Sequence, residues 1–215
     1  MAKVKFVRWV SIMALIALLV TAIPTQALAS ETEDHLDMPT YNQFDYPDVP
    51  YGIKGKSVAD CGCGITSLAM VAAYLYQDES ITPEYLATVY GNPEKKVEDV
   101  DYSSLVTMMV SIGTKHLGLD MELTYSFYDA VEALEEGKVV ISLQNPGLFT
   151  SVYNGHFIVF RGVTEDGKIL VRDPNGYTYN KYPTYFAEGF PKSKLWDTGS
   201  GYWVVTVAEM TTPNS

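Results

Sequence analysis

The sequence is poor in the residues that build metal centres and disulfide frameworks, with only 2 cysteines and 3 histidines among 215 residues. The histidines, His35, His116 and His156, have no paired spacing, and neither His-Glu-x-x-His nor repeated Cys-x-x-Cys occurs, so we expect no metal. Cys61 and Cys63 are separated by one residue, and a disulfide across so short a loop would be strained. We therefore expect two free thiols, and a reversible bond that masks a nucleophile is the lesser alternative.

Basic residues are also scarce, because 15 Lys and Arg face 26 Asp and Glu, which gives a net charge of −11. Residues 1–29 hold three of the basic residues and none of the acids, which leaves the remainder at −14. Such acidity argues against a nucleic-acid partner. The net negative charge is otherwise explained by the need to keep the protein soluble, and it predicts no cationic partner.

Only one long apolar run is present, and it lies near the start of the chain. Lys3, Lys5 and Arg8 precede the run 10–23, and the small-residue stretch Ala27-Leu28-Ala29 follows it, as in a secretory signal peptide. The run is shorter than the ~20 apolar residues that a membrane span needs. We expect cleavage after Ala29 and a secreted, extracellular product whose mature form makes no membrane contact. Because no cysteine lies at the cleavage site, the sequence carries no signature of lipid attachment.

The rest of the chain has the length of one domain with a substantial core, and it contains no internal repeats or low-complexity tracts. Residues 30–38 are acidic and predict a flexible N-terminus, and residues 39–210 are expected to form the domain. The aromatic and proline-rich segment 39–52 predicts a loop around the folded body, and the charged stretch 94–101 predicts a solvated loop. The sequence gives no indication of oligomeric state.

Helical patterns precede strand patterns along the chain. Helices are expected over 59–77, 83–90 with a Thr82 cap and a stop at Gly91, about 103–112, and from a cap near Ser126 to Glu136. Strands are expected over 138–143, 157–163, 168–172 and 202–207. This segregation predicts an α+β domain in which a helical lobe packs against an antiparallel sheet, with a cleft where they meet.

The expected helix 59–77 places Cys63 in its first turn. Apolar residues recur there at helical spacing, which predicts a buried central helix. Unpaired backbone N–H groups and the helix dipole favour a thiolate at this position, and Gly62 and Gly64 leave the thiol open to substrate. The alternative is a small, buried core cysteine, the commonest fate of a free thiol.

A predicted hairpin brings His156 and Asp173 to the same end of the sheet, because His156 begins one strand and Asp173 follows the next. If the connecting loop has an even number of residues, both side chains lie on the same face; a three-residue loop would separate them. A carboxylate bonded to one imidazole nitrogen frees the other to take a proton from a thiol. The alternatives are a histidine at a strand end and an ordinary Asp-Pro-Asn-Gly turn.

These residues resemble the papain-superfamily cysteine peptidases related to the bacteriocin-processing, double-glycine leader peptidases, in their exported stand-alone branch. Residues 62–70, Gly-Cys-Gly-Ile-Thr-Ser-Leu-Ala-Met, match the nucleophile motif with Ile65 in place of proline. Gly155-His156-Phe157-Ile158-Val159 and Asp173-Pro174 match the other two motifs. The Asp-Cys-Gly at 60–62 copies another family form, but the residues downstream fix the register on Cys63 and leave Cys61 as the runner-up.

The resemblance implies a papain-like fold and a peptide or protein substrate, with Cys63 as nucleophile, His156 as general base and Asp173 as its orienting carboxylate. It also implies that a glutamine before the nucleophile shares the oxyanion with the backbone N–H of Cys63. Gln43 is the candidate, although it lies twenty positions upstream, and the alternative is a loop glutamine in water. This chemistry requires no cofactor. Cleavage of double-glycine leaders is not carried over, because those relatives are domains of transporters.

Three functions follow from these residues. The first is a secreted cysteine peptidase that works through an acyl-enzyme. The second is a papain-like amidase or acyltransferase that acts on cell-wall peptides. The third is a papain-like binding domain that has lost activity, which the departure at Ile65 and the distance of Gln43 keep open.

Overall fold

The structure, a computed structural model, describes residues 37–91, 102–153 and 155–208. The expected signal peptide, most of the acidic N-terminus and the loop 94–101 lie outside these ranges. Among the helices of the described ranges, none combines the length and the apolar character that crossing a membrane requires.

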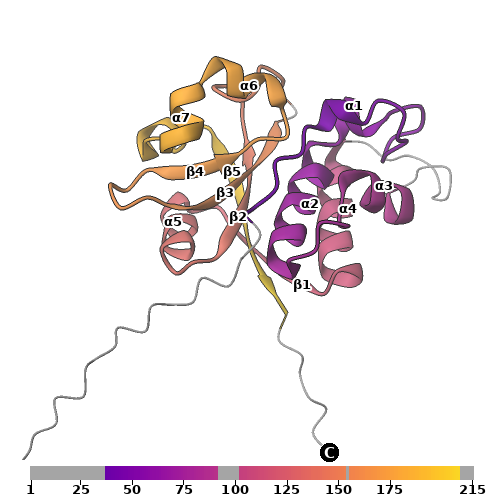
Figure 1. Ribbon diagram of the computed structural model, residues 1–215, viewed down its shortest axis with the longest axis horizontal. Coiled ribbons are helices and arrows are strands. Elements are labelled where there is room, and N and C mark those ends of the chain that lie inside the picture. The colour runs from indigo at the N-terminus through magenta and orange to yellow at the C-terminus, as the bar shows by residue number, and fades with distance from the viewer. Residues whose placement is uncertain (1–36, 92–101, 154, 209–215) are drawn as a thin grey trace, which may run out of the picture. The chain divides into compact units, whose positions relative to one another are not determined.

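The described residues form an α+β fold, as the sequence predicts (Figure 1). The helices are α1 (Val58–Cys61), α2 (Cys63–Tyr76), α3 (Pro83–Tyr90), α4 (Tyr102–Ser111), α5 (Phe127–Glu135), α6 (Gly176–Lys181) and α7 (Pro183–Glu188). The strands are β1 (Leu119–Thr124), β2 (Val139–Gln144), β3 (His156–Val163), β4 (Ile169–Arg172) and β5 (Gly199–Val207). The described residues also form three short helical segments, η1 (Gln43–Asp45), η3 (Ile112–His116) and η4 (Lys192–Lys194).

The five strands form one sheet in the order β1-β5-β2-β3-β4, and every neighbouring pair is antiparallel. Both faces of the sheet are covered. Along β2, Val139 and Ile141 join the core beneath α2, whereas Val140, between them, joins a second core beneath α5. This arrangement follows from the two-residue period of a strand and explains why the β2 sequence begins with three consecutive apolar residues.

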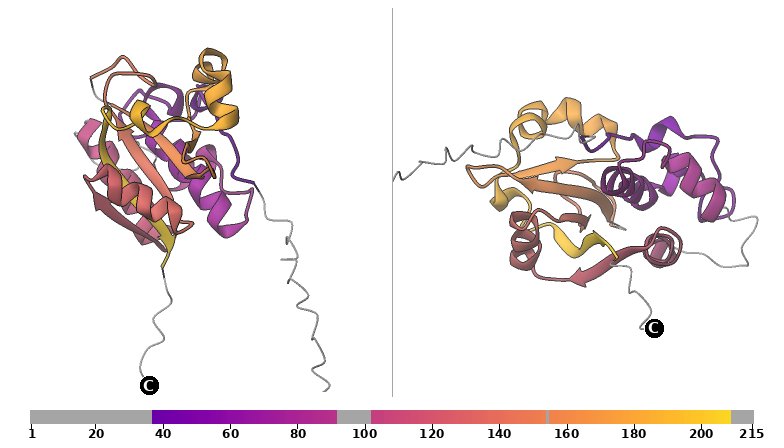
Figure 2. Two further views of the ribbon diagram at one scale, coloured as in Figure 1. Left: turned by 90° about the vertical axis from the view of Figure 1, so that its left-hand side faces the viewer. Right: turned by 60° about the horizontal axis from the view of Figure 1, so that its bottom comes forward.

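Helices α1–α4 gather on one side of the sheet, and α5 lies on the other (Figures 1 and 2). Helix α2 is the centre of the first group, because every residue from Gly64 to Ala73 is buried. The sequence grouped α5 with the helical half of the chain. In the structure, Val131 and Leu134 of α5 instead pack against the face of the sheet that is turned away from α2.

The expected central helix is divided at Gly62, which ends α1 and caps the start of α2. A Cβ atom on Gly62 would lie 2.4 Å from the carbonyl oxygen of Val58, so only glycine fits there without a backbone shift. The break makes Cys63 the first residue of α2. The thiol is therefore in the first helical turn, where the sequence predicted it.

The hairpin of β3 and β4 has an odd loop, not the even loop on which the predicted orientation depended. Val163 pairs with Ile169, so five residues connect the strands. A register shift between Phe160 and Gly162 then compensates, and Val159 pairs with Arg172 nearer the site. Because of this β-bulge, the residues at the open end of the hairpin have the relative orientation that an even loop would give.

Candidate active site

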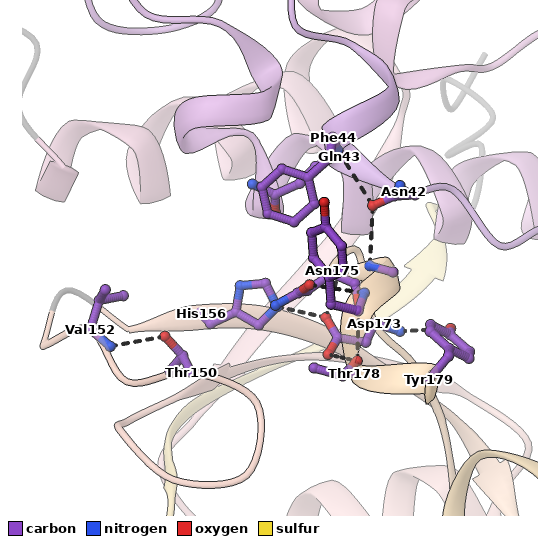
Figure 3. Close-up of polar contacts among 12 residues, drawn as sticks. Asn42, Gln43, Phe44, Thr150, Val152, His156, Asp173, Asn175, Thr178 and Tyr179 are labelled. Atoms are coloured by element: carbon purple, nitrogen blue, oxygen red, sulfur yellow. Dashed lines mark hydrogen bonds and ion pairs between the residues drawn. The ribbon is translucent and has the colours of Figure 1, made fainter. Parts of the chain in front are cut away.

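Cys63, His156 and Gln43 line one cavity of about 570 Å³ between the α1–α4 side and the sheet. Cys63 comes from the start of α2, His156 from the start of β3 and Gln43 from η1. Asp173, just after β4, lies behind the imidazole of His156 (Figure 3). The structure thus brings together all four residues that the sequence singled out.

Asp173 holds the imidazole of His156 from the side away from the cavity. The Nε2 atom of His156 lies 2.6 Å from Oδ1 of Asp173. Asp173 is fully buried and His156 is 8% exposed, so water competes little for this contact. With Nε2 engaged by the carboxylate, Nδ1 is the ring nitrogen left for the thiol.

The carboxylate of Asp173 is itself held by the turn that follows it. The backbone N–H of Asn175 donates to Oδ1 at 2.8 Å, and the hydroxyl of Thr178 donates to Oδ2 at 2.7 Å. The backbone N–H of Asp173 donates to the hydroxyl oxygen of Tyr179 at 3.0 Å. Sequence reasoning recognised the Asp-Pro-Asn-Gly turn but assigned no role to Thr178. A short polar side chain five residues after Asp173 gives no signal of its own in a sequence.

The thiol of Cys63 is partly exposed and electrostatically favoured as thiolate. Burial by itself raises its pKa, but the hydrogen bond and the charge of His156, with the backbone N–H groups of Phe157 and Gly64, lower the pKa below its ordinary value. Burial likewise lowers the pKa of His156, but Asp173 and Cys63 outweigh this effect and raise that pKa to about 10. A thiolate beside an imidazolium is therefore the favoured state of the pair.

Cys61, the alternative nucleophile, has the opposite environment. Its thiol is buried and lies 3.5 Å from the carbonyl oxygen of Ser57 and 3.6 Å from that of Tyr51, within donating distance of both. Burial raises its pKa to about 11. Two carbonyl acceptors stabilise the protonated thiol, so Cys61 has the character of an inert core cysteine.

Gln43 is buried and is held from both sides of the cleft. Its backbone N–H donates to the carbonyl oxygen of Pro174 at 2.8 Å. Its side-chain Nε2 donates to the carbonyl oxygen of Ala59 in α1 at 3.0 Å. A primary amide has two N–H bonds, so the second remains able to donate, and Gln43 lines the cavity. The residue is not the water-exposed loop glutamine that the sequence left as an alternative.

Segments from both sides of the cleft line the cavity. Leu105 and Val106 of α4 line the helical side, and the loop 147–152 lines the opposite side. Near Gln43, the rings of Phe44 and Tyr177 lie 5.3 Å apart, and both residues line the cavity. Within the described residues, no group of three or more His, Cys, Asp or Glu side chains is arranged to hold a metal ion.

A thiol, an imidazole and a carboxylate in this order on an α+β scaffold are the arrangement found in papain-like cysteine peptidases. Comparison with protein families agrees, because the Peptidase_C39 like family matches residues 35–201. The match covers most of the chain, and the chain belongs to this family.

Among solved structures, the chain is similar to the crystal structure of a protein described as a C39-like peptidase from Bacillus anthracis, with 17% sequence identity and a TM-score of 0.44. The similarity covers 80% of this chain and 96% of that chain. A comparison with curated proteins found no match.

Proposed function

We propose that this protein is a secreted cysteine peptidase that hydrolyses peptide bonds through Cys63, His156 and Asp173. The observation that carries the proposal is the 2.6 Å contact between Nε2 of His156 and Asp173, which leaves Nδ1 to the thiol at the start of α2. The lowered pKa of Cys63 supports a nucleophile that ionises more readily than an ordinary thiol.

In the first step, the thiolate of Cys63 attacks the carbonyl carbon of a peptide bond. A C–S bond forms, and the carbonyl electron pair moves to the oxygen. This oxyanion accepts hydrogen bonds from the backbone N–H of Cys63 and from the free N–H of the Gln43 amide. The C–N bond then breaks as His156 gives its proton to the leaving nitrogen, which releases an amine and leaves a thioester on Cys63.

In the second step, water attacks the thioester carbonyl while neutral His156 takes one of its protons. The C–S bond breaks, the acid product leaves, and the thiolate–imidazolium pair is restored. Asp173 keeps the imidazole in one orientation throughout, because its contact with Nε2 prevents the ring from turning away. Neither step consumes a cofactor.

Secretion is part of the proposal and rests on the signal-peptide pattern of residues 1–29. We propose that the working form is the domain 39–210, preceded by the acidic segment 30–38, with a peptide or protein as substrate. Mass spectrometry of the protein exported by a producing cell tests this, with an N-terminus at residue 30 as the expected result. A product that retains residues 1–29 would contradict it.

The catalytic proposal is tested by incubating the mature protein with an unfolded protein substrate and identifying new peptide ends by mass spectrometry. Cys63→Ala and His156→Ala are expected to abolish cleavage, whereas Cys61→Ala retains most of it. Equal loss at both cysteines would overturn the assignment of the nucleophile.

Iodoacetamide labelling separates the alternatives. If Cys63 is labelled rapidly below the ordinary thiol pKa but no protein is cleaved, the amidase or acyltransferase is favoured, and cell-wall peptides become the next substrates to test. If Cys63 is labelled only as an ordinary thiol, in the wild type and in His156→Ala alike, the protein is a binding domain.

A further inference from the structure

The segment that carries Gln43 is short and has few bonds of its own. Its three-residue helix η1 is closed by two backbone contacts, from Asp45 N–H to the carbonyl oxygen of Asn42 at 3.1 Å and from Tyr46 N–H to that of Gln43 at 3.2 Å. Such a segment does not hold a catalytic amide in place without outside support, because each isolated turn is only marginally stable in water. The support must come from contacts to the rest of the fold.

Asn42 supplies such contacts with both ends of its side-chain amide. Figure 3 shows the hydrogen bonds that its Oδ1 accepts. Its Oδ1 accepts hydrogen bonds from the backbone N–H of Gly176 at 3.1 Å and from that of Phe44 at 3.4 Å. Its Nδ2 donates to Oδ1 of Asp45 at 2.8 Å. The side chain of Asn42 therefore caps η1, binds Asp45 at the end of η1, and links η1 to the turn that follows Asp173.

The partner of Asn42 is the turn 173–176, which also holds the imidazole in place. This turn contributes the carboxylate of Asp173 to His156, the carbonyl oxygen of Pro174 to the backbone of Gln43, and the N–H of Gly176 to Asn42. A Cβ atom on Gly176 would lie 2.9 Å from Cγ of Asn42, so the close approach requires glycine. The oxyanion donor and the orienting carboxylate are thus fixed to the same turn.

We propose that Asn42 is a positioning residue, which sets Gln43 relative to the turn 173–176 so that the free N–H of its amide faces the oxyanion. The inference rests on the proposed function, because it assigns to Asn42 a role in that reaction. Asn42 acts through Gln43 and does not touch the reacting atoms. Its loss is therefore expected to weaken the step that needs an oxyanion hole and to leave the thiolate–imidazolium pair unchanged.

The test compares two reactions of Cys63, of which only one needs the oxyanion hole. Peptide cleavage forms an oxyanion, whereas alkylation by iodoacetamide is a displacement of iodide at carbon and forms none. In Asn42→Ala, we expect kcat for a fluorogenic peptide, made from a sequence that the wild type cleaves, to fall about tenfold with KM nearly unchanged. This is less than the loss of about 100-fold or more that removal of an oxyanion donor causes. The rate of alkylation and its pH profile should remain those of the wild type.

A charge exchange provides the rescue. Asn42→Asp keeps the acceptor for the N–H groups of Gly176 and Phe44 but sets a second carboxylate against Asp45, where the contact is now 2.8 Å. The double variant Asn42→Asp/Asp45→Asn restores a donor opposite an acceptor. We expect the single variant to lose kcat and the double variant to recover most of it. Asn180→Ala, an exposed asparagine in α6, serves as the matched control with wild-type kcat.

The outcomes separate this inference from the proposed function. A wild type that is alkylated at Cys63 but cleaves no peptide overturns both. An active wild type with unchanged kcat in Asn42→Ala overturns the inference alone. If alkylation of Asn42→Ala slows as much as cleavage does, Asn42 acts on the thiolate pair or on the fold, and the positioning role is wrong. Loss of kcat with intact alkylation, together with rescue by the double variant, supports it.

Discussion

Replacing Thr178 by valine removes one hydrogen bond from the buried carboxylate of Asp173 while keeping the shape of the side chain. Thr178 is 6% exposed and Asp173 is fully buried, so water cannot replace the lost donor. The hydroxyl of Thr178 lies 2.7 Å from Oδ2 of Asp173 and 2.8 Å from the carbonyl oxygen of Asn175. Its single proton favours the charged acceptor, which forms the stronger bond.

The magnitude follows from the contacts that remain. Asp173 keeps His156 and the N–H of Asn175 on Oδ1, but Oδ2 loses the hydroxyl of Thr178. A hydrogen bond to a charged group contributes about 1.5–3 kcal/mol, so we expect a loss of about 2 kcal/mol in the free energy of unfolding. For a domain of this size, that corresponds to a fall in Tm of about 4–8 °C.

Differential scanning calorimetry of the mature protein measures the effect, with two comparison variants. Thr178→Ser keeps the hydroxyl and should lose only the smaller contribution of a methyl group, about 1 kcal/mol. Thr107→Val, at an exposed position of α4, should stay within about 0.5 kcal/mol of the wild type. If Thr178→Val had the same Tm as Thr107→Val, the reasoning would be refuted, because the carboxylate of Asp173 would then not depend on the hydroxyl of Thr178.

Four further predictions concern the pH profile of activity, the pKa of Cys63, the core and the strand that carries the imidazole. Activity should rise below the ordinary thiol range as Cys63 ionises, because its pKa is lowered, and fall near pH 10 as His156 loses its proton; a kcat/KM profile checks both limbs. In His156→Ala the pKa of Cys63 should move up, since burial is no longer opposed, and an unchanged alkylation midpoint would contradict the pairing. Leu68→Ala, in the fully buried part of α2, should cost about 3 kcal/mol in urea unfolding, and a cost under about 1 kcal/mol would contradict its central place in the core. Gly155 has a φ of +79°, and a Cβ atom there would lie 2.7 Å from Cδ1 of Leu143. In Gly155→Ala, we therefore expect the start of β3 to shift and kcat/KM to fall, and an unchanged kcat/KM would disprove this.

Local signals account for the elements that the sequence predicted well. Helix α3 begins after Thr82, whose hydroxyl accepts from the N–H of Tyr85, and it ends at Gly91, as expected. Strand β1 was not predicted, because it is an edge strand in which only Leu119 and Met121 are buried. Helices α6 and α7 were also missed, since each has only six residues, of which one is buried, and so shows no apolar periodicity.

The sequence also indicated which residues meet in the cleft, because motifs fix the places of Cys63, His156 and Asp173 along the chain. It did not predict how the hairpin delivers the last two to one face, since the β-bulge near Arg161 has no reliable signature in one sequence. The contacts of Asn42 were likewise out of reach. The contact with Gly176 joins residues more than a hundred positions apart, and only tertiary structure brings such residues together.

The contrast between the two cysteines makes the native chain a convenient substrate for spectroscopic probes. The whole sequence contains only these two thiols, and Cys61 is buried with a pKa raised to about 11. At neutral pH, a thiol-reactive fluorophore or spin label should therefore attach at Cys63 alone, without any cysteine being removed by mutation. The attached reporter would sit in the cleft itself, where its emission or mobility would respond to each peptide that enters.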